Sequence, residues 1–149
     1  MDLDARRYQA ALAHQAYGVV LLGDDRRIEF VNQQLCDLFG LPKRPTELIG
    51  LTAEQFLELA APAFAEPAET VSRIQTILRD GSDHLRDEIQ LRDGRTIVLD
   101  STPVILDGRP AGRLWSHRDV TEGKRAQEAL RLSEEKFAKA FQTSPYALA

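Results

Sequence analysis

The hydrophobic pattern of the first third of the chain predicts a helix followed by a β-hairpin. Apolar residues recur at three- and four-residue spacings over residues 3–17, which is typical of a short amphipathic helix. The apolar run Val19–Leu22 reads as a buried strand, and Arg27–Val31 alternates between polar and apolar residues, as a half-buried strand does. The tight turn Gly23-Asp24-Asp25 joins the two strands.

Helical stripes dominate the middle of the chain. Asn32 is a favoured N-cap residue and predicts a helix that ends at Gly40. Thr52 caps a second short helix in the same way, and a clean apolar face predicts a third helix over residues 70–80. Prolines predict loops between these helices at Pro42, Pro45, Pro62 and Pro67.

The pattern then changes to three strands, over residues 84–91, 96–106 and 112–118. In the first of them, Leu85, Ile89 and Leu91 are expected on one face. Two Asp-Gly pairs predict the hairpin turns between the strands. Pro103 cannot donate a ladder hydrogen bond, so it predicts a bulge or a free edge. The whole pattern predicts an α+β fold with about five antiparallel strands and short helices.

A long polar helix follows the last strand. Only Gly123 interrupts the helical pattern between Thr121 and Pro145, and Asp119 or Thr121 is suited to the N-cap. A narrow stripe with spacings of four, three, four and three predicts a parallel two-chain coiled coil, although the helix could instead pack on its own domain. The stripe consists of Ala126, Leu130, Ser133, Phe137 and Ala140.

The end of the chain repeats its beginning. Tyr8, Leu12 and Tyr17 align at a constant offset with Phe137, Phe141 and Tyr146. The expected organisation is therefore a flanking helix (1–17), a core domain (18–121), a linker helix (122–142) and the start of a second, similar domain (143–149).

Composition and charge narrow the class of protein. Of the 149 residues, 43% are hydrophobic and 28% charged, which is typical of a soluble globular domain. The net charge of −4 comes from interspersed acids and bases, so no nucleic-acid partner is expected. No apolar run is long enough to cross a membrane, and the single cysteine fits a reducing cytoplasm, so we expect a cytoplasmic protein.

Four blocks in order resemble the PAS family of sensory domains. Residues 18–40 are similar to the first hairpin and the following helix of that family, and Leu48-Ile49-Gly50 to its middle helical turn. The run from Gly94 to Val104 resembles the penultimate strand, and Arg118-Asp119-Val120-Thr121-Glu122 resembles the closing Asp-Ile-Thr signature.

This resemblance implies a five-stranded antiparallel sheet with helices over one face, often enclosing a small-molecule pocket. It further implies a sensory or regulatory domain that forms a homodimer and passes a signal through its C-terminal helix to a downstream effector. A histidine kinase is the expected effector and a diguanylate cyclase is an alternative. A ligand-free module that only pairs two chains is the competing interpretation.

The apolar residues expected to face the sheet–helix interior are candidates for lining such a pocket, although a solid core is equally expected. They are Ile28, Phe30, Leu35, Leu38, Phe56, Ile74, Ile77, Leu78, Ile89, Leu91, Ile97, Leu99 and Leu114, with Ser101 and Ser116 as polar contacts. Trp115 alternates with Leu114 and is therefore expected to face away from this interior, towards the N-terminal helix or a partner subunit.

Cofactor chemistry receives little support from the sequence. Cys36 is not in the Asn-Cys-Arg-like context of light-sensing flavin domains, and burial is expected for it. Residues 70–80 contain no histidine, which disfavours haem and leaves His84 as a remote candidate ligand, while His117 is expected on a surface or sheet face. The sequence is compatible with a non-covalent flavin or a small apolar ligand.

No catalytic or metal-binding constellation emerges, so the fragment is not expected to be an enzyme, whatever its parent protein does. The residues expected to act are those at the start of the closing helix. Arg118, Asp119 and Thr121 are predicted to relay the signal by capping and ionic contacts.

Overall fold

The computed structural model describes residues 17–143, apart from the side chain of Thr143. Two compact units divide the chain, one ending at Asp119 and the other beginning at Val120. The predicted N-terminal helix lies outside the described residues except for Tyr17. The part of the predicted repeat after Thr143 also lies outside them.

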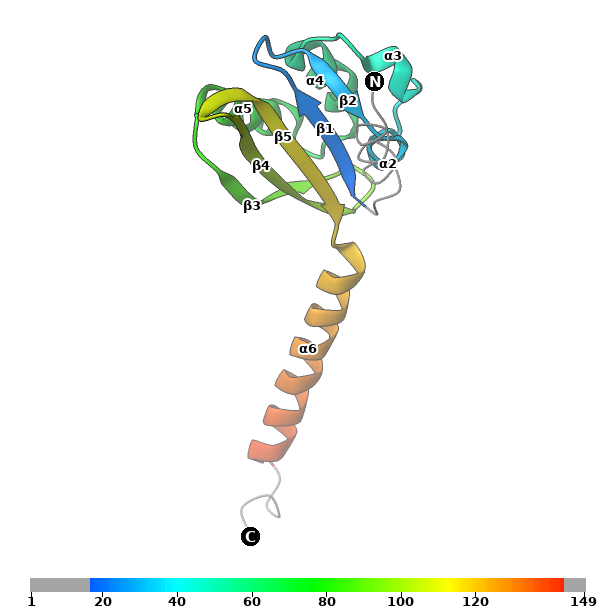
Figure 1. Ribbon diagram of the computed structural model, residues 1–149. Coiled ribbons are helices and arrows are strands. Elements are labelled where there is room, and N and C mark those ends of the chain that lie inside the picture. The colour runs from blue at the N-terminus through cyan, green and yellow to red at the C-terminus, as the bar shows by residue number, and fades with distance from the viewer. Residues whose placement is uncertain (1–16, 144–149) are drawn as a thin grey trace, which may run out of the picture. The chain divides into compact units, whose positions relative to one another are not determined.

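The first unit contains a five-stranded antiparallel sheet (Figure 1). Its strands are β1 (Gly18–Leu22), β2 (Ile28–Val31), β3 (His84–Gln90), β4 (Thr96–Leu106) and β5 (Arg109–Asp119). The spatial order is β2-β1-β5-β4-β3, so the N-terminal hairpin pairs with the last strand of the C-terminal meander. The predicted α+β class and the five antiparallel strands are confirmed.

Helices connect the two halves of the sheet and cover one of its faces. They are α2 (Gln33–Phe39), α3 (Pro45–Leu48), α4 (Ala53–Ala60), the 3₁₀ helix η1 (Ala61–Ala63) and α5 (Pro67–Arg79). The core lies between this layer and the sheet; its fully buried side chains include Leu35, Leu48 and Phe64 from the helical side and Ile97 and Leu99 from β4. Helix α6 (Thr121–Thr143) forms the second unit and confirms the predicted C-terminal helix.

Local sequence signals explain where the helices begin. The side chain of Asn32 accepts a hydrogen bond from the Leu35 amide (3.1 Å), and Thr52 accepts one from the Gln55 amide (3.1 Å), so both predicted N-caps are confirmed. Three of the proline predictions were wrong, since Pro62 lies in the 3₁₀ helix η1 and two others begin helices. Pro45 and Pro67 each occupy the first helical position, where a missing amide hydrogen has no consequence because that amide has no helical partner.

Two irregularities in the strands also matter. The predicted bulge at Pro103 is confirmed by a register shift between Pro103 and Ile105. A second shift lies between His84 and Asp87 in β3, where Arg86 has a positive φ of 60°. This bulge breaks the alternation, so the prediction for Leu85 was wrong: its side chain is 61% exposed.

Candidate functional site

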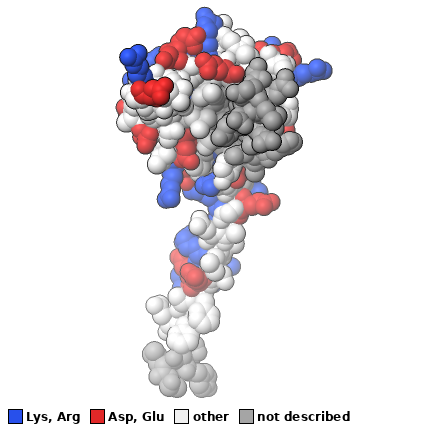
Figure 2. All heavy atoms as spheres, viewed as in Figure 1, with Lys and Arg blue, Asp and Glu red and all other residues white. Residues whose placement is uncertain are grey.

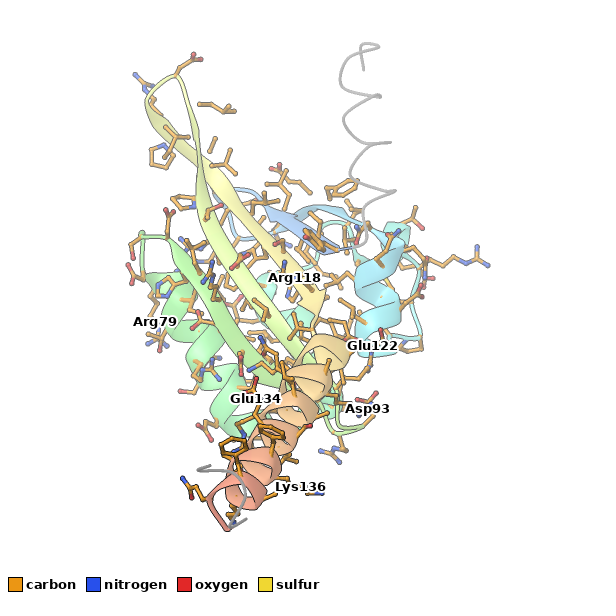
Figure 3. The ribbon with its side chains drawn as sticks, turned by 90° about the horizontal axis from the view of Figure 1, so that it is seen from below. Arg79, Asp93, Arg118, Glu122, Glu134 and Lys136 are labelled. Atoms are coloured by element: carbon orange, nitrogen blue, oxygen red, sulfur yellow. The ribbon has the colours of Figure 1, made fainter. Side chains whose placement is uncertain are left out.

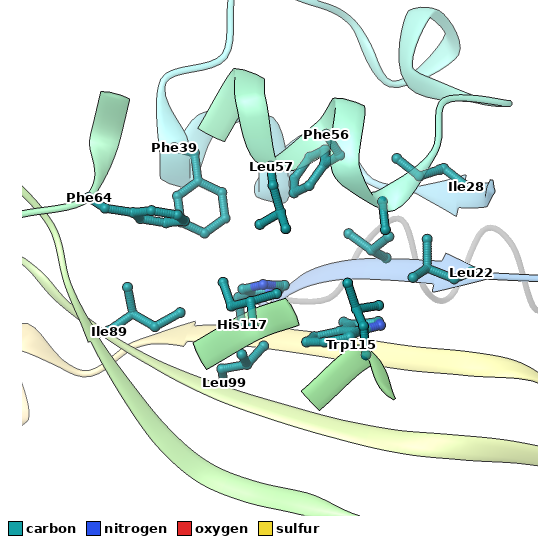
Figure 4. Close-up of a pocket in the computed structure, with 14 residues that line it drawn as sticks. Leu22, Ile28, Phe39, Phe56, Leu57, Phe64, Ile89, Leu99, Trp115 and His117 are labelled. Atoms are coloured by element: carbon teal, nitrogen blue, oxygen red, sulfur yellow. The ribbon is translucent and has the colours of Figure 1, made fainter. Parts of the chain in front are cut away.

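A small apolar cavity lies between the inner face of the sheet and the helical layer (Figure 4). Its volume is about 40 Å³. All five strands and helices α2, α4 and α5 contribute to its wall. The lining residues are Val20, Leu22, Ile28, Phe39, Ala53, Phe56, Leu57, Phe64, Ile74, Leu78, Ile89, Leu99, Trp115 and His117.

The predicted pocket residues divide into groups. Six of them line the cavity: Ile28, Phe56, Ile74, Leu78, Ile89 and Leu99. Five belong to the surrounding core without lining the cavity: Leu35, Leu38, Ile77, Leu91 and Ile97. The remaining four do not line the cavity: Phe30 on β2, Ser101 on β4, and Leu114 and Ser116 on β5.

The prediction for Phe30 was wrong. Val20 pairs with Val31 and Leu22 with Ile28, and all four side chains belong to the core. The register shifts between these two pairs, which gives β2 one extra residue and places Phe30 opposite Leu21, on the outer face of the sheet. Simple alternation from Ile28 could not reveal this bulge.

The prediction for β5 was wrong by one residue. Trp115 is 5% exposed and lines the cavity together with His117, whereas Leu114 and Ser116 are only partly buried and occupy the opposite face. The cross-strand pairs Ser101–Trp115 and Leu99–His117 fix this register. Because each face of β5 carries a mixture of polar and apolar residues, its pattern did not show which face is buried.

Ser101 is fully buried, but it acts as a partner of a buried arginine and does not line the cavity. The Nε of Arg113 donates to Ser101 Oγ at 2.6 Å, and its other nitrogens donate to the backbone oxygens of Asp80 (3.0 Å) and Ser82. Burial lowers the pKa of the guanidinium, while the charges of Asp80 and Asp83 oppose this shift. Arg113 therefore ties the segment after α5 to the sheet, next to Trp115, whose ring centre is 5.8 Å from its Cζ.

His117 is a second polar residue of the interior. It lies on a face of the sheet, one of the two predicted positions, but this is the inner face, where the side chain is buried. Its Nδ1 lies 3.1 Å from the backbone oxygen of Gly18, and the ring of Phe39 packs edge-on against the imidazole. Burial lowers the pKa of His117 to about 4, although the Gly18 contact favours the protonated form. The imidazole is therefore neutral at pH 7. Because the Gly18 oxygen can only accept, Nδ1 carries the proton.

The indole of Trp115 has an unusual position for a polar group. Within the part of the chain that the structure describes, its buried Nε1 has no hydrogen-bond partner. Buried indole N–H groups normally find one. The cavity is therefore apolar except for one free donor, Trp115, and one imidazole, His117.

The cavity is smaller than the cofactors found in some sensory domains. A cavity of about 150 Å³ holds benzene, so 40 Å³ does not fit the three rings of a flavin, or a haem, in the present side-chain arrangement. Cys36 is buried outside the cavity lining, and burial raises the pKa of its thiol. His84 contacts the Asp80 carboxylate at 2.9 Å and lies outside the lining, and the described residues contain no cluster of metal-binding side chains.

Helix α6 exposes the predicted stripe. Ala126, Leu130, Ser133, Phe137 and Ala140 are all exposed, with 60% of Leu130 and 69% of Phe137 accessible. Glu134 and Lys136 flank the stripe (Figure 3). On the same helix, Arg131 pairs with Glu128 (2.6 Å) and Glu135 (3.1 Å), away from the stripe.

The predicted relay residues lie where β5 gives way to α6. β5 ends at Asp119 and α6 begins at Thr121, so Val120 is the only residue between them. The Val120 oxygen accepts the first helical hydrogen bond, from the Lys124 amide (2.9 Å). Arg118 stacks on the ring of Tyr17, with 5.7 Å between its Cζ and the ring centre.

Figure 2 shows acidic and basic side chains interspersed over the visible face. Among the described helices, none is both long and apolar enough to span a bilayer.

Comparison with known proteins agrees with this architecture. A sequence profile described as the PAS domain matches residues 16–122. The chain belongs to the PAS domain family. A search of curated proteins returned no significant match.

Three solved structures illustrate the similarity of this PAS domain to others. The sensor region of a sensor histidine kinase shares 23% identity at a TM-score of 0.55; the match covers 72% of this chain and 40% of that one. A PAS domain from Colwellia psychrerythraea gives 19% identity, a TM-score of 0.54 and coverages of 81% and 99%. The phage VqmA–DPO complex shares 17% identity at a TM-score of 0.57; the match covers 87% of this chain and 59% of that one. At these identities, the likeness establishes the fold.

Proposed function

We propose that this PAS domain is a sensory module of a larger signalling protein, in which occupation of the cavity is relayed through α6. One observation carries the proposal. β5 contributes Trp115 and His117 to the cavity wall and continues into α6 after a single residue. A change in the cavity that shifts β5 is therefore transmitted along the backbone to the start of the helix.

The output is a pair of α6 helices from two chains. A stripe of Leu130 and Phe137 with small residues between them matches the seam of a two-chain coiled coil. Ser133 and two alanines make the seam shallow, so its two arrangements differ little in free energy. The signal is then a population shift between these arrangements.

Pairing is tested by sedimentation of two matched variants. Leu130→Glu places a charge in the seam and should convert a dimer to a monomer. Leu132→Glu introduces the same charge at an exposed position outside the stripe and should leave the dimer intact. If both variants sediment like the unaltered chain, the stripe is not the dimer seam.

Arg118, Asp119 and Thr121 are the proposed relay. In the full-length protein, Asp119→Ala should change the activity of the effector, while the isolated chain keeps its thermal midpoint. A large loss of stability would instead assign Asp119 a structural role.

The proposed effector is a histidine kinase, with a diguanylate cyclase as the alternative, and the proposed location is the cytoplasm. Similarity to the sensor region of a histidine kinase supports the first choice. The parent protein then carries the catalytic activity, and this domain regulates it.

A second candidate is a ligand-free module that only pairs two chains, and the small cavity favours it. At about 40 Å³, the interior is close to a solid core. Native mass spectrometry and absorbance of the purified protein distinguish the two candidates: a co-purified molecule supports the sensor, and an empty dimer supports the assembly module.

A further inference from the structure

A groove of about 270 Å³ lies on the surface of the first unit, between the β1–β2 turn, the end of α5 and the β4–β5 hairpin. It is distinct from the interior cavity, and Leu22 and Leu78, which belong to both linings, form the wall between the two. We infer that this groove binds a small carboxylate with an apolar body, and that the guanidinium of Arg79 holds the carboxylate. Arg79 is the last residue of α5 (Figure 3).

The charges of the groove favour an anion. Three arginines and two aspartates line it, although the chain as a whole has a net charge of −4. One of these acids, Asp80, is already engaged, because its carboxylate accepts from the Ser82 amide at 3.0 Å and lies 2.9 Å from His84 Nε2. The other, Asp24, belongs to the exposed β1–β2 turn. Arg79 makes no hydrogen bond or ion pair with another described residue, so its guanidinium is available to a ligand.

The other two arginines are held in place and neutralise the end of α5. The Nη2 of Arg26 donates to the Leu78 oxygen at 3.2 Å, and the Nη1 of Arg113 donates to the Asp80 oxygen at 3.0 Å. The carbonyl oxygens at the C-terminal end of a helix would otherwise repel an anion. Arg79 can then bind a carboxylate through two parallel N–H groups, the geometry that a guanidinium provides.

The β4–β5 hairpin supplies an apolar part of the wall. Pro103, Ile105 and Pro110 line the groove there, and Ile105 is 54% exposed. A ligand that covers Ile105 removes apolar area from water, which favours binding. The volume is sufficient for a ring, since a cavity of about 150 Å³ holds benzene. A phenyl ring that carries one carboxylate therefore fits the groove.

Strand β5 connects this groove to the proposed output. Gly112 and Arg113 line the groove, Trp115 and His117 line the interior cavity, and α6 follows the strand after Val120. A carboxylate in the groove therefore contacts the strand that leads into α6, whether or not the interior cavity is occupied. The groove adds a second ligand position to the proposed sensory function and does not depend on the first.

Three probes of nearly the same shape test the recognition of charge: benzoate, benzamide and benzamidine, which are an anion, a neutral molecule and a cation at pH 7. In ¹⁵N–¹H spectra of the protein, benzoate should shift the amide signals of Gly23, Gly81 and Gly112, which line the groove. The signals of Gly40 and Gly94, outside the lining, should stay in place. A dissociation constant in the millimolar range is expected for about nine heavy atoms. Benzamide should bind about tenfold more weakly, because it lacks the charge-assisted hydrogen bonds, and benzamidine more weakly still.

Three variants assign the contributions of single side chains. Arg79→Gln removes the charge of an exposed side chain and should reduce the preference for benzoate over benzamide from about tenfold to about one. Arg73→Gln makes the same change on the same helix, outside the lining, and should keep the preference. Ile105→Ser should weaken both probes about threefold and leave their ratio unchanged, because both rings cover this side chain.

Several results would overturn the inference. Equal affinities of benzoate and benzamide, or equal ratios in Arg79→Gln and Arg73→Gln, would show that Arg79 does not recognise the carboxylate. Shifts confined to glycines outside the groove, or no shift with any probe at millimolar concentrations, would show that the groove is not a binding site. None of these results bears on the interior cavity, so the sensory proposal and this inference fail separately.

Discussion

At the scale of single residues, three side chains with polar groups are buried on one strand of this PAS domain. His117, Trp115 and Arg113 alternate along β5 and all point to the helical side of the sheet. The three side chains are accommodated differently: a neutral imidazole with one hydrogen bond, an indole whose N–H has no hydrogen-bond partner among the described residues, and a guanidinium that donates to three groups. The stability of the core therefore depends on how these three side chains of one strand are accommodated.

The burial of His117 makes folding sensitive to acid. Unfolded His117 takes up a proton near its ordinary pKa of about 6.5, but the folded form does so only at about 4. Between these values the unfolded state binds more protons, so the free energy of unfolding falls as pH decreases, by about 3 kcal/mol from this residue. Urea unfolding at pH 7 and pH 4.5 should show most of this loss.

Two variants isolate the contribution of the imidazole. His117→Phe cannot titrate and should have a shallower pH dependence, whatever its stability at pH 7. Phe39→Leu removes the ring packed against the imidazole and should lower stability while keeping the wild-type slope. Equal slopes for His117→Phe and the unaltered chain would show that other groups cause the acid sensitivity.

Arg113 should contribute to stability through the groups it satisfies. Arg113→Met leaves Ser101 Oγ and two backbone oxygens without their donor and should lower the free energy of unfolding by about 2–4 kcal/mol. Amide hydrogen exchange of residues 80–83 should accelerate. Arg109→Met, at an exposed position on the same strand, is the control and should change unfolding by less than about 0.5 kcal/mol. Similar losses in both variants would contradict the assigned role.

At the scale of elements, the sequence pattern predicts the order and type of strands and helices better than it predicts which face of each strand is buried. Hairpin turns, caps and apolar runs are local, so five strands and the closing helix could be predicted from them. The bulges near Phe30 and Leu85 arise in the pairing of each strand with its hairpin neighbour, β1 and β4, and the alternation of residues within a single strand does not reveal them. The same limit applies to β5. Each of its faces carries both polar and apolar residues, so the pattern did not place Trp115 and His117 on the buried face.

Asn32 shows how one side chain can connect several elements. Its Oδ1 accepts from the amides of Leu35 in α2 and Val19 in β1, and its Nδ2 donates to the oxygen of Tyr17. Asn32→Ala should therefore lower the free energy of unfolding by about 3 kcal/mol, more than a cap alone contributes. Chemical denaturation of Thr52→Ala provides the comparison, because Thr52 caps only α4; a loss of about 1 kcal/mol is expected there. If the two losses are equal, the contacts of Asn32 with β1 and Tyr17 are not stabilising.

At the scale of the whole molecule, the hydrophobic core and the proposed output lie in different units. Every member of the core cluster precedes Val120, whereas the side chains of α6 from Glu122 to Gln142 are exposed. The fragment 1–119 should therefore fold by itself and unfold cooperatively, at a midpoint that does not depend on protein concentration. The 149-residue chain should unfold at a midpoint that rises with protein concentration, because pairing of α6 stabilises the folded state by mass action.

Thermal unfolding of both proteins over a hundredfold concentration range tests this prediction. The variant Leu130→Glu of the 149-residue chain is the control and should behave like the fragment. A fragment without a cooperative transition would show that the core depends on residues after 119. A midpoint independent of concentration in the 149-residue chain would show that α6 does not pair.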